Sequence, residues 1–369
     1  MNLKTNIFFE VDDEWNSNLL KNISSTTYQT SFWAQVYQQV YGSKPVFISI
    51  EKPNGEIIAQ LTTVIHNRYF WIKSNIIAQT LGIKLNLRTY IHWFYGPIIF
   101  DETLTDEVLQ EILTTLERLS KDNKVQMIRG TSLPTSKPNN LYKNTCYQEA
   151  KWSTYVVDLT QNIDTLFNSL NKKTRYDVRK SEKNDLTFKV ADTRDELDQY
   201  LNLKYVSIER GGGKTIKSHK KREKIISDFN DAHWNLLHKK GLEKLFLVKH
   251  DDELLGGITC FTFNKNMYQH GVGNSAKTEL LGGTFLTWNT IKWGMENAFH
   301  KFDLGGVNPN PSSAKEQQID FYKSKWGGQK FDYLVYTKIF DKLRVKLGTI
   351  LENPRGISQK ITKFLRNDL

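Results

Sequence analysis

The chain has 369 residues, of which 39% are hydrophobic and 12% aromatic, and it carries a formal net charge of +11. This length exceeds the size at which a single hydrophobic core usually stops growing, and the apolar content argues against intrinsic disorder, so we expect two folded domains. The positive charge indicates an anionic partner, such as phosphates, nucleic acid or a membrane surface, although a lysine-rich surface that serves solubility alone would give the same balance.

The cysteine and histidine content excludes several kinds of site. Cys146 and Cys260 are the only cysteines, and their separation gives neither a disulfide framework nor the spacing of a zinc site. The histidines are scattered, so we expect no metal. The first residues lead into a polar, acidic segment, and no apolar run is long enough to span a bilayer. These features predict a cytoplasmic protein, with peripheral contact at the inner face of an anionic membrane left open.

The first half of the chain predicts a mixed pattern of strands and helices. Strands are expected at 46–50 and 57–64, on either side of the turn Pro53-Asn54-Gly55, as a hairpin. Leucine and isoleucine recur at helical spacing over 105–121, and a further strand is expected near 125–129.

The run 133–144, rich in Pro, Ser and Asn, marks the boundary between two domains. We therefore predict one domain over 1–150 and a second over 151–334. The C-terminal tail, 335–369, carries apolar residues at helical spacing among many cations. It is expected to pack back on the first domain, and docking on an anionic membrane is the alternative.

The second half predicts its own series of elements. Alternating apolar residues predict strands at 153–159, 187–190, 244–249, 254–263 and 268–272. Helical spacing predicts helices at 163–170, 194–209 and 222–238.

A strongly basic stretch lies within this second half. It holds six cations between Lys172 and Lys183, and Arg175 and Arg179 stand four residues apart, so a helix would carry both guanidinium groups on one face. Guanidinium groups bind phosphate oxygens in pairs, and this face could therefore hold a pyrophosphate or an RNA backbone. A solvated basic helix is the alternative interpretation.

The stretch from Leu281 to Lys330 carries the clearest sequence of signals. A helix is expected to start just after Gly282-Gly283-Thr284, and its first N–H groups and dipole would form an anion site in which Gly283 and Thr284 meet the ligand. Residues 302–306 predict a short buried strand that breaks at a glycine pair. A polar loop is expected next, and it leads to a segment, 321–328, in which two lysines alternate with aromatic residues.

The order of these features resembles the C-terminal half of the Fem-type aminoacyltransferases, which add amino acids to the peptidoglycan stem peptide and belong to the GNAT acyltransferase superfamily. The resemblance is carried by the helix 286–293, the strand end 302–306 and the motif Tyr322-Lys323-x-x-Trp326-Gly327-Gly328. It implies an α/β (α+β) fold with two tandem GNAT-like domains, each with a mixed central sheet flanked by helices. It also implies that Lys172, Arg175 and Arg179 bind the phosphates of a nucleotide- or lipid-linked precursor.

Acyl transfer to an amine needs positive charge where the carbonyl oxygen becomes anionic. Lys323, which aligns with a lysine of the family motif, is the candidate for a cation near the reacting carbonyl or near the acceptor phosphates, with Tyr322 beside it. Asp303 could accept a proton or orient the amine, and a carboxylate that only stabilises a turn is the alternative. Tyr268 and Trp326 are candidates for lining the pocket.

Two departures from the family pattern stand out. In some members of the family, a lysine contacts the precursor phosphates, and Tyr37 is placed at that position here. Several relatives also have a long coiled-coil arm, which has no counterpart between 192 and 240 in this sequence. A nucleotide-linked acceptor is therefore less strongly implied, and a compact, short-armed member is expected.

Two functions follow from the resemblance, neither of which needs a cofactor. The first is the transfer of an aminoacyl group from aminoacyl-tRNA to an amine of a peptidoglycan precursor. The second is acyl transfer from acyl-CoA to an amino sugar of a surface-polysaccharide precursor. The coenzyme A loop of GNAT proteins, Arg/Gln-x-x-Gly-x-Gly/Ala, has only a partial counterpart in Leu281-Gly282-Gly283-Thr284, which favours the first function.

Overall fold

The computed structural model describes residues 3–67, 76–135, 146–210 and 227–352. We call residues 3–135 the N-terminal half and residues 146–328 the C-terminal half. The first contains β1 (Lys4–Phe8), α1 (Asp13–Leu19), α2 (Ser31–Tyr41), β2 (Lys44–Glu51), β3 (Ile57–Asn67), α3 (Ile76–Lys84), β4 (Thr89–Trp93), β5 (Ile98–Ile99), α4 (Thr105–Asp122) and β6 (Met127–Thr131). The second contains β7 (Gln148–Asp158), α5 (Ile163–Ser169), α6 (Lys172–Ser181), β8 (Leu186–Val190), α7 (Arg194–Arg210), β9 (Glu243–His250), β10 (Glu253–Phe263), β11 (Asn266–Asn274), α9 (Gly282–Glu296), β12 (Lys301–Val307) and α10 (Ala314–Ser324).

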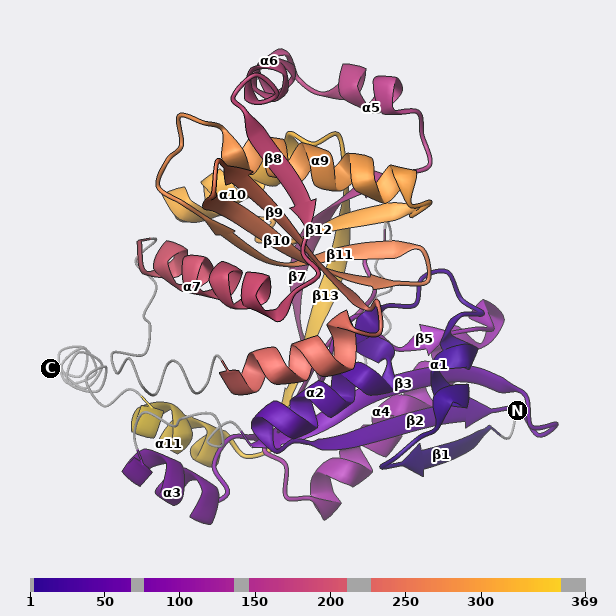
Figure 1. Ribbon diagram of the computed structural model, residues 1–369. Coiled ribbons are helices and arrows are strands. Elements are labelled where there is room, and N and C mark those ends of the chain that lie inside the picture. Colours follow the sequence, from indigo (N-terminus) through magenta and orange to yellow (C-terminus); the bar gives the residue numbers. More distant parts are fainter. Residues whose placement is uncertain (1–2, 68–75, 136–145, 211–226, 353–369) are drawn as a thin grey trace, which may run out of the picture.

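The strands of the described residues form one mixed sheet that runs through both halves. Its order is β1-β2-β3-β4-β6-β13-β7-β12-β11-β10-β9-β8, and β5 pairs with β3. Strand β13 (Gln329–Ile339) lies at the centre, where it pairs with β7 of the C-terminal half and with β6 of the N-terminal half (Figure 1). After it, α11 (Lys342–Glu352) contacts α3.

Each half has its own apolar core against this sheet. In the N-terminal half, α4 buries one face, which includes Val108, Ile112 and Leu116, against β2 and β6. Each such side chain contributes about 1.5–3 kcal/mol when it is fully buried. A third cluster joins the halves, because Trp33 and Tyr95 pack with Phe261 and Tyr268.

Helices cover both faces of the sheet in the C-terminal half. Helix α9 packs on β8, β9 and β10, and α7 packs on β10 and β11. The approach of α7 is very close, since a Cβ on Gly273 would lie 2.8 Å from the Cα of Lys204. Glycine is therefore required at this position of β11 for the helix to reach the sheet.

The predicted fold class is confirmed, because the chain forms a mixed α/β structure with a large mixed sheet. The hairpin of β2 and β3 and the helix over 105–121 are also confirmed, and the strand near 125–129 begins two residues later, at Met127. The division at residues 150 and 334 stays a prediction; both positions lie inside strands, β7 and β13.

Two local predictions were wrong. Strand β12 does not break at the glycine pair but continues through it to Val307. The expected polar loop contains a helix, α10, which is stabilised by a capping box between Ser313 and Glu316. Parts of three other predictions lie outside the described residues: the linker after 135, the start of the helix expected at 222 and the tail after 352.

Candidate active site

Strands β11 and β12 are parallel neighbours that separate after a short shared segment. They pair only from Asn266 to Tyr268 on β11 and from Lys301 to Asp303 on β12. Beyond this point β11 continues along β10, whereas β12 continues along β7. The separation leaves backbone groups of the two facing edges available to other partners.

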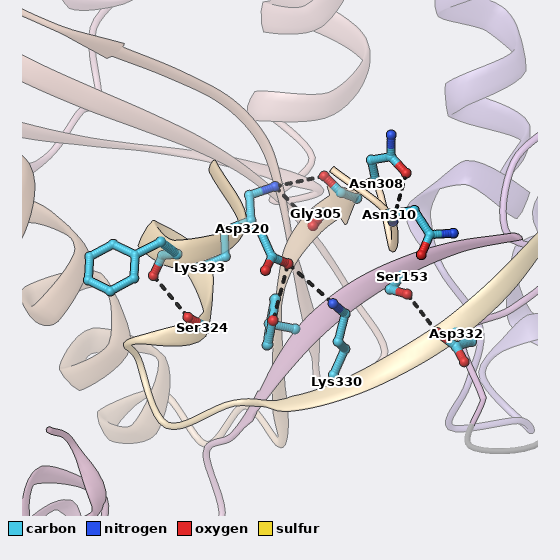
Figure 2. Close-up of polar contacts among 12 residues, drawn as sticks. Ser153, Gly305, Asn308, Asn310, Asp320, Lys323, Ser324, Lys330 and Asp332 are labelled. Atoms are coloured by element: carbon cyan, nitrogen blue, oxygen red, sulfur yellow. Dashed lines mark hydrogen bonds and ion pairs between the residues drawn. The ribbon is translucent and has the colours of Figure 1, made fainter. Parts of the chain in front are cut away.

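Lys323 occupies this region of separation. Its ammonium donates hydrogen bonds to the carbonyl oxygens of Gly305 and Gly306, at 2.9 and 3.1 Å (Figure 2). Gly305 has a φ of +81°, and a Cβ there would lie 3.3 Å from both the Lys323 ammonium and the Gln269 carbonyl oxygen, so only glycine fits without strain. Burial lowers the pKa of Lys323 to about 8, and the negative charge of Asp303 opposes this shift.

Asp303 lies at the point where the two strands separate, and its side chain is only 3% exposed. One carboxyl oxygen accepts hydrogen bonds from the Thr154 hydroxyl and from the Gly305 N–H group. The other oxygen, Oδ2, is buried and lacks a hydrogen-bond partner, although the Tyr95 hydroxyl is near enough to lower the carboxyl pKa. Burial is the largest effect, and it raises the pKa of Asp303 above its ordinary value.

Four tyrosines surround this carboxylate. They come from both halves and from β13, and they are Tyr28, Tyr95, Tyr268 and Tyr333. Burial raises the pKa of each hydroxyl, and the charge of Asp303 raises it further. The rings of Tyr95 and Tyr268 lie 5.9 Å apart, and those of Tyr95 and Tyr333 lie 5.5 Å apart. Four uncharged tyrosine hydroxyls therefore lie around the buried carboxyl group of Asp303.

A small pocket of about 80 Å³ borders this acid. Asp303, Tyr268 and Lys301 line it together with Ser24 and Leu133 of the N-terminal half. The pocket therefore lies between the halves. The buried carboxylate of Asp303 and the exposed ammonium of Lys301, two positions apart on β12, both line it. Among the described residues there is no group of three or more His, Cys, Asp or Glu side chains that could hold a metal.

The start of α9 forms the second polar region of the site. The N–H groups of Thr284 and Phe285 donate to the Leu281 carbonyl, and no side chain caps the helix. Gly282 and Gly283 thus supply the donors of the first turn that can meet a ligand. Tyr322 connects this start to α10, since its hydroxyl donates to the Gly283 carbonyl at 3.2 Å and lies 2.7 Å from the Thr287 hydroxyl.

Two further groups border the start of α9. The buried Oδ1 atom of Asn274 lacks a partner and would lie 3.5 Å from a Cβ on Gly283. Arg210 at the end of α7 donates to the Asn274 carbonyl at 2.9 Å, which holds a guanidinium group beside the helix start. The glycine run that follows Arg210 lies outside the described residues.

The basic stretch forms helix α6, as the spacing indicates, and α6 packs on α9. Both guanidinium groups have partners within the corner between α5 and α6. Arg175 donates to the carbonyls of Asn168 and Leu170, and the Arg179 guanidinium lies 5.1 Å from the centre of the Phe167 ring. Lys172 is exposed. The phosphate-binding role of these three residues stays a prediction, and the structure offers a structural role for two of them.

The structure thus groups Lys323, Asp303 and Tyr268 where β11 and β12 separate, and it joins Tyr322 to Gly283 at the start of α9. Among the described residues, no hydrogen bond or ion pair joins Lys323 to Arg175 or Arg179. Trp326 is fully buried in the core of the C-terminal half. Sequence reasoning missed Tyr28, Tyr95 and Thr154, which carry no local motif. It also missed Arg210 as a neighbour of α9.

Comparisons with known proteins agree with this fold. Residues 168–324 match the model of the GNAT acetyltransferase domain family. The crystal structure of FemX covers 94% of this chain, and the chain covers 99% of FemX, with a TM-score of 0.69 and 14% identity. The chain therefore resembles the GNAT acetyltransferase domain over these residues and shares the fold of FemX.

Two further proteins are similar to this chain. The lipid II:glycine glycyltransferase of Staphylococcus aureus is 21% identical over 180 residues, which is 46% of this chain and 43% of that protein. The chain therefore matches less than half the length of this curated relative. A tandem GNAT protein from the clavulanic acid pathway has the same fold, with a TM-score of 0.55, 11% identity and coverage of 92% of this chain and 98% of its own.

The partners of Arg175 give a test of its role. We expect Arg175→Ala to lower the free energy of unfolding by about 2 kcal/mol, because two carbonyls lose a charged donor at the corner between α5 and α6. Urea unfolding of the purified protein measures this change. Lys172→Ala, at an exposed position on the same helix, should change the unfolding midpoint little. Equal midpoints for both variants would leave Arg175 with no structural role.

Proposed function

We propose that this chain is an N-acyltransferase that moves an aminoacyl group from aminoacyl-tRNA to an amine of a peptidoglycan precursor. The observation that carries the proposal is the Lys323 ammonium, held by two glycine carbonyls where β11 and β12 separate and paired electrostatically with buried Asp303. An ammonium fixed in a site from which water is largely excluded stabilises a developing oxyanion far better than one in solvent.

The proposed reaction is a direct attack without a covalent enzyme intermediate. The acceptor amine attacks the ester carbonyl carbon of the donor, and Lys323 stabilises the oxyanion. Asp303 takes the amine proton, since a carboxyl whose pKa is raised by burial is a stronger base than an ordinary one. The C–O bond to the ribose then breaks, the ribose oxygen takes up the proton that Asp303 had accepted, and an amide bond remains.

The start of α9 supports a donor that carries phosphate. The N–H groups of Gly282 and Gly283 and the guanidinium of Arg210 give hydrogen-bond donors and positive charge beside the site. Phosphates occur both at the end of a tRNA and in coenzyme A. The curated relative is a glycyltransferase that acts on lipid II by its name, and this supports the aminoacyl donor over acyl-CoA.

The pocket between the halves supports an acceptor with an amine. A primary amine that enters it would meet Asp303, whose Oδ2 atom has no hydrogen-bond partner. The name of the curated relative supports a lipid-linked cell-wall precursor as the acceptor. No helix among the described residues is long and apolar enough to cross a membrane. We propose that the chain works on the cytoplasmic side, where aminoacyl-tRNA is present.

A transfer assay tests the proposal. The purified full chain is incubated with a mixture of labelled aminoacyl-tRNAs or with acetyl-CoA, and with lipid II or its nucleotide-linked precursor. Mass spectrometry then shows which acceptor gains which acyl group. We expect an amide-linked amino acid on the lipid-linked acceptor from the tRNA donor. Transfer from acetyl-CoA alone, or no transfer from either donor, would refute the proposal.

A further inference from the structure

Two helices from distant parts of the chain lie side by side at the edge of the N-terminal half, α3 and α11 (Figure 1). Their surroundings expose six of the sixteen large hydrophobic side chains that are exposed in the described part: Leu81, Leu85, Phe340, Leu343, Leu347 and Ile350. We call these six residues the α3–α11 patch. Such a concentration is unusual, because monomeric proteins rarely leave large apolar patches in water.

The apolar residues of α11 follow the period of a helix. Leu343, Leu347 and Ile350 lie four and three residues apart, so they share one face, and their side chains are 67%, 44% and 36% exposed. The opposite face carries Val345, which is partly buried. Helix α11 therefore turns an apolar stripe away from the protein, whereas a helix of a globular protein normally turns this stripe inward.

Cations flank this stripe on both sides. At 100° per residue, Lys342 and Lys346 lie on one side of the stripe and Arg344 lies on the other, and all three are exposed. Lys84, at the end of α3, is also exposed. A further exposed lysine, Lys124, lies close to this end of α3, because the Asn86 side chain donates a hydrogen bond to the Lys124 carbonyl. An apolar stripe bordered by lysine and arginine is the pattern of a helix that lies in the interface of an anionic bilayer.

The charge also argues against a second copy of this chain as the partner. A two-fold symmetric contact places the same surface on both molecules, and it would bring these cations toward one another. Anionic lipid headgroups would instead neutralise the lysines while the acyl region takes up the leucines.

We propose that the α3–α11 patch docks the protein on an anionic lipid bilayer, with the outer stripe of α11 inserted at the level of the headgroups. The proposal rests on exposed side chains and charge, so it holds whether or not the transfer reaction is as described above. It locates a membrane contact on two helices outside the candidate active site.

Sedimentation with lipid vesicles tests this. The full chain is mixed with vesicles of equal parts phosphatidylglycerol and phosphatidylcholine, or of phosphatidylcholine alone. We expect binding to the anionic vesicles only, weakening as salt rises. The double variant Leu343→Asp/Leu347→Asp should bind more than about tenfold more weakly, because it places two acids within the inserted stripe.

A matched variant controls for charge and folding. Val206→Asp/Ile208→Asp changes two exposed apolar residues of α7 in the same way and should bind as the unchanged protein does. Circular dichroism checks that both variants are folded. Absence of vesicle binding by the unchanged protein, or equal loss in both folded variants, would overturn the proposal. So would a dimer in sedimentation velocity that only the α11 variant disrupts, since the stripe would then be a contact between copies.

Discussion

Lys323→Met should lower the rate of acyl transfer by about a hundredfold to a thousandfold, which is the usual cost of removing one donor to an oxyanion. Methionine fills a similar volume but carries no charge, so the carbonyls of Gly305 and Gly306 lose their donor. Single-turnover kinetics with the donor and acceptor that the transfer assay selects measure the effect. The loss should lie in the chemical step and not in the affinity for the acceptor.

The pH dependence separates this role from a purely structural one. Burial lowers the pKa of Lys323 to about 8, so the ammonium is lost as the pH rises through this value, and kcat/KM should fall there. The methionine variant should lack this fall. Lys330→Met removes a lysine that is paired with Asp320 at 3.2 Å (Figure 2), and it should leave the rate unchanged. A methionine variant at position 323 with normal turnover would remove Lys323 from the reaction.

Asp303→Asn should lower kcat/KM by about a hundredfold at neutral pH, because the acceptor amine loses the base that takes its proton. A second effect distinguishes this variant. The negative charge of Asp303 raises the pKa of Lys323, so its removal lowers that pKa further, and the fall in rate should move to lower pH. A pH profile of kcat/KM measures both effects together.

The same variant should not be less stable at neutral pH. The pKa of Asp303 is raised in the folded protein, so its contribution to stability is present at acid pH and is lost as the pH rises through the folded-state pKa. Replacement by neutral asparagine therefore removes a cost at pH 7, and thermal unfolding should occur at the same or a higher temperature. Asp332→Asn is the control, because Asp332 also accepts from a hydroxyl, that of Ser153, at 2.6 Å (Figure 2). Equal activity of the two variants would contradict the role of Asp303.

The elements of this fold were largely predictable because each carries its own local signal. The hairpin of β2 and β3 follows from a turn between two apolar runs, and α4 follows from leucines at helical spacing. The helix α10 was also predictable, since Ser313 and Glu316 form a capping box whose two residues stand three apart. The nearby prolines, Pro309 and Pro311, favour a loop, whereas the capping pair favours a helix.

The site was predictable only in part. Lys323 and Gly283 lie in motifs that the family resemblance identifies, but the shell around Asp303 is assembled from Tyr28, Tyr95 and Thr154, which are far apart in the chain. No periodicity signals such long-range contacts. For the basic helix α6, a local signal was present but pointed to a ligand. The charge spacing suggested that Arg175 binds phosphate, whereas in the structure its guanidinium group donates to two backbone carbonyls between α5 and α6.

The central position of β13 limits how the molecule can move. Residues 329–337 of this strand are hydrogen-bonded along β7 and residues 335–339 along β6, so consecutive peptide groups of one segment are shared by the two halves. A hinge that opened the halves like a clamshell would have to break this ladder, at the cost of several buried backbone hydrogen bonds. We therefore expect substrates to enter and leave through movements of side chains and of segments at the edge of the site, while β6, β13 and β7 stay paired.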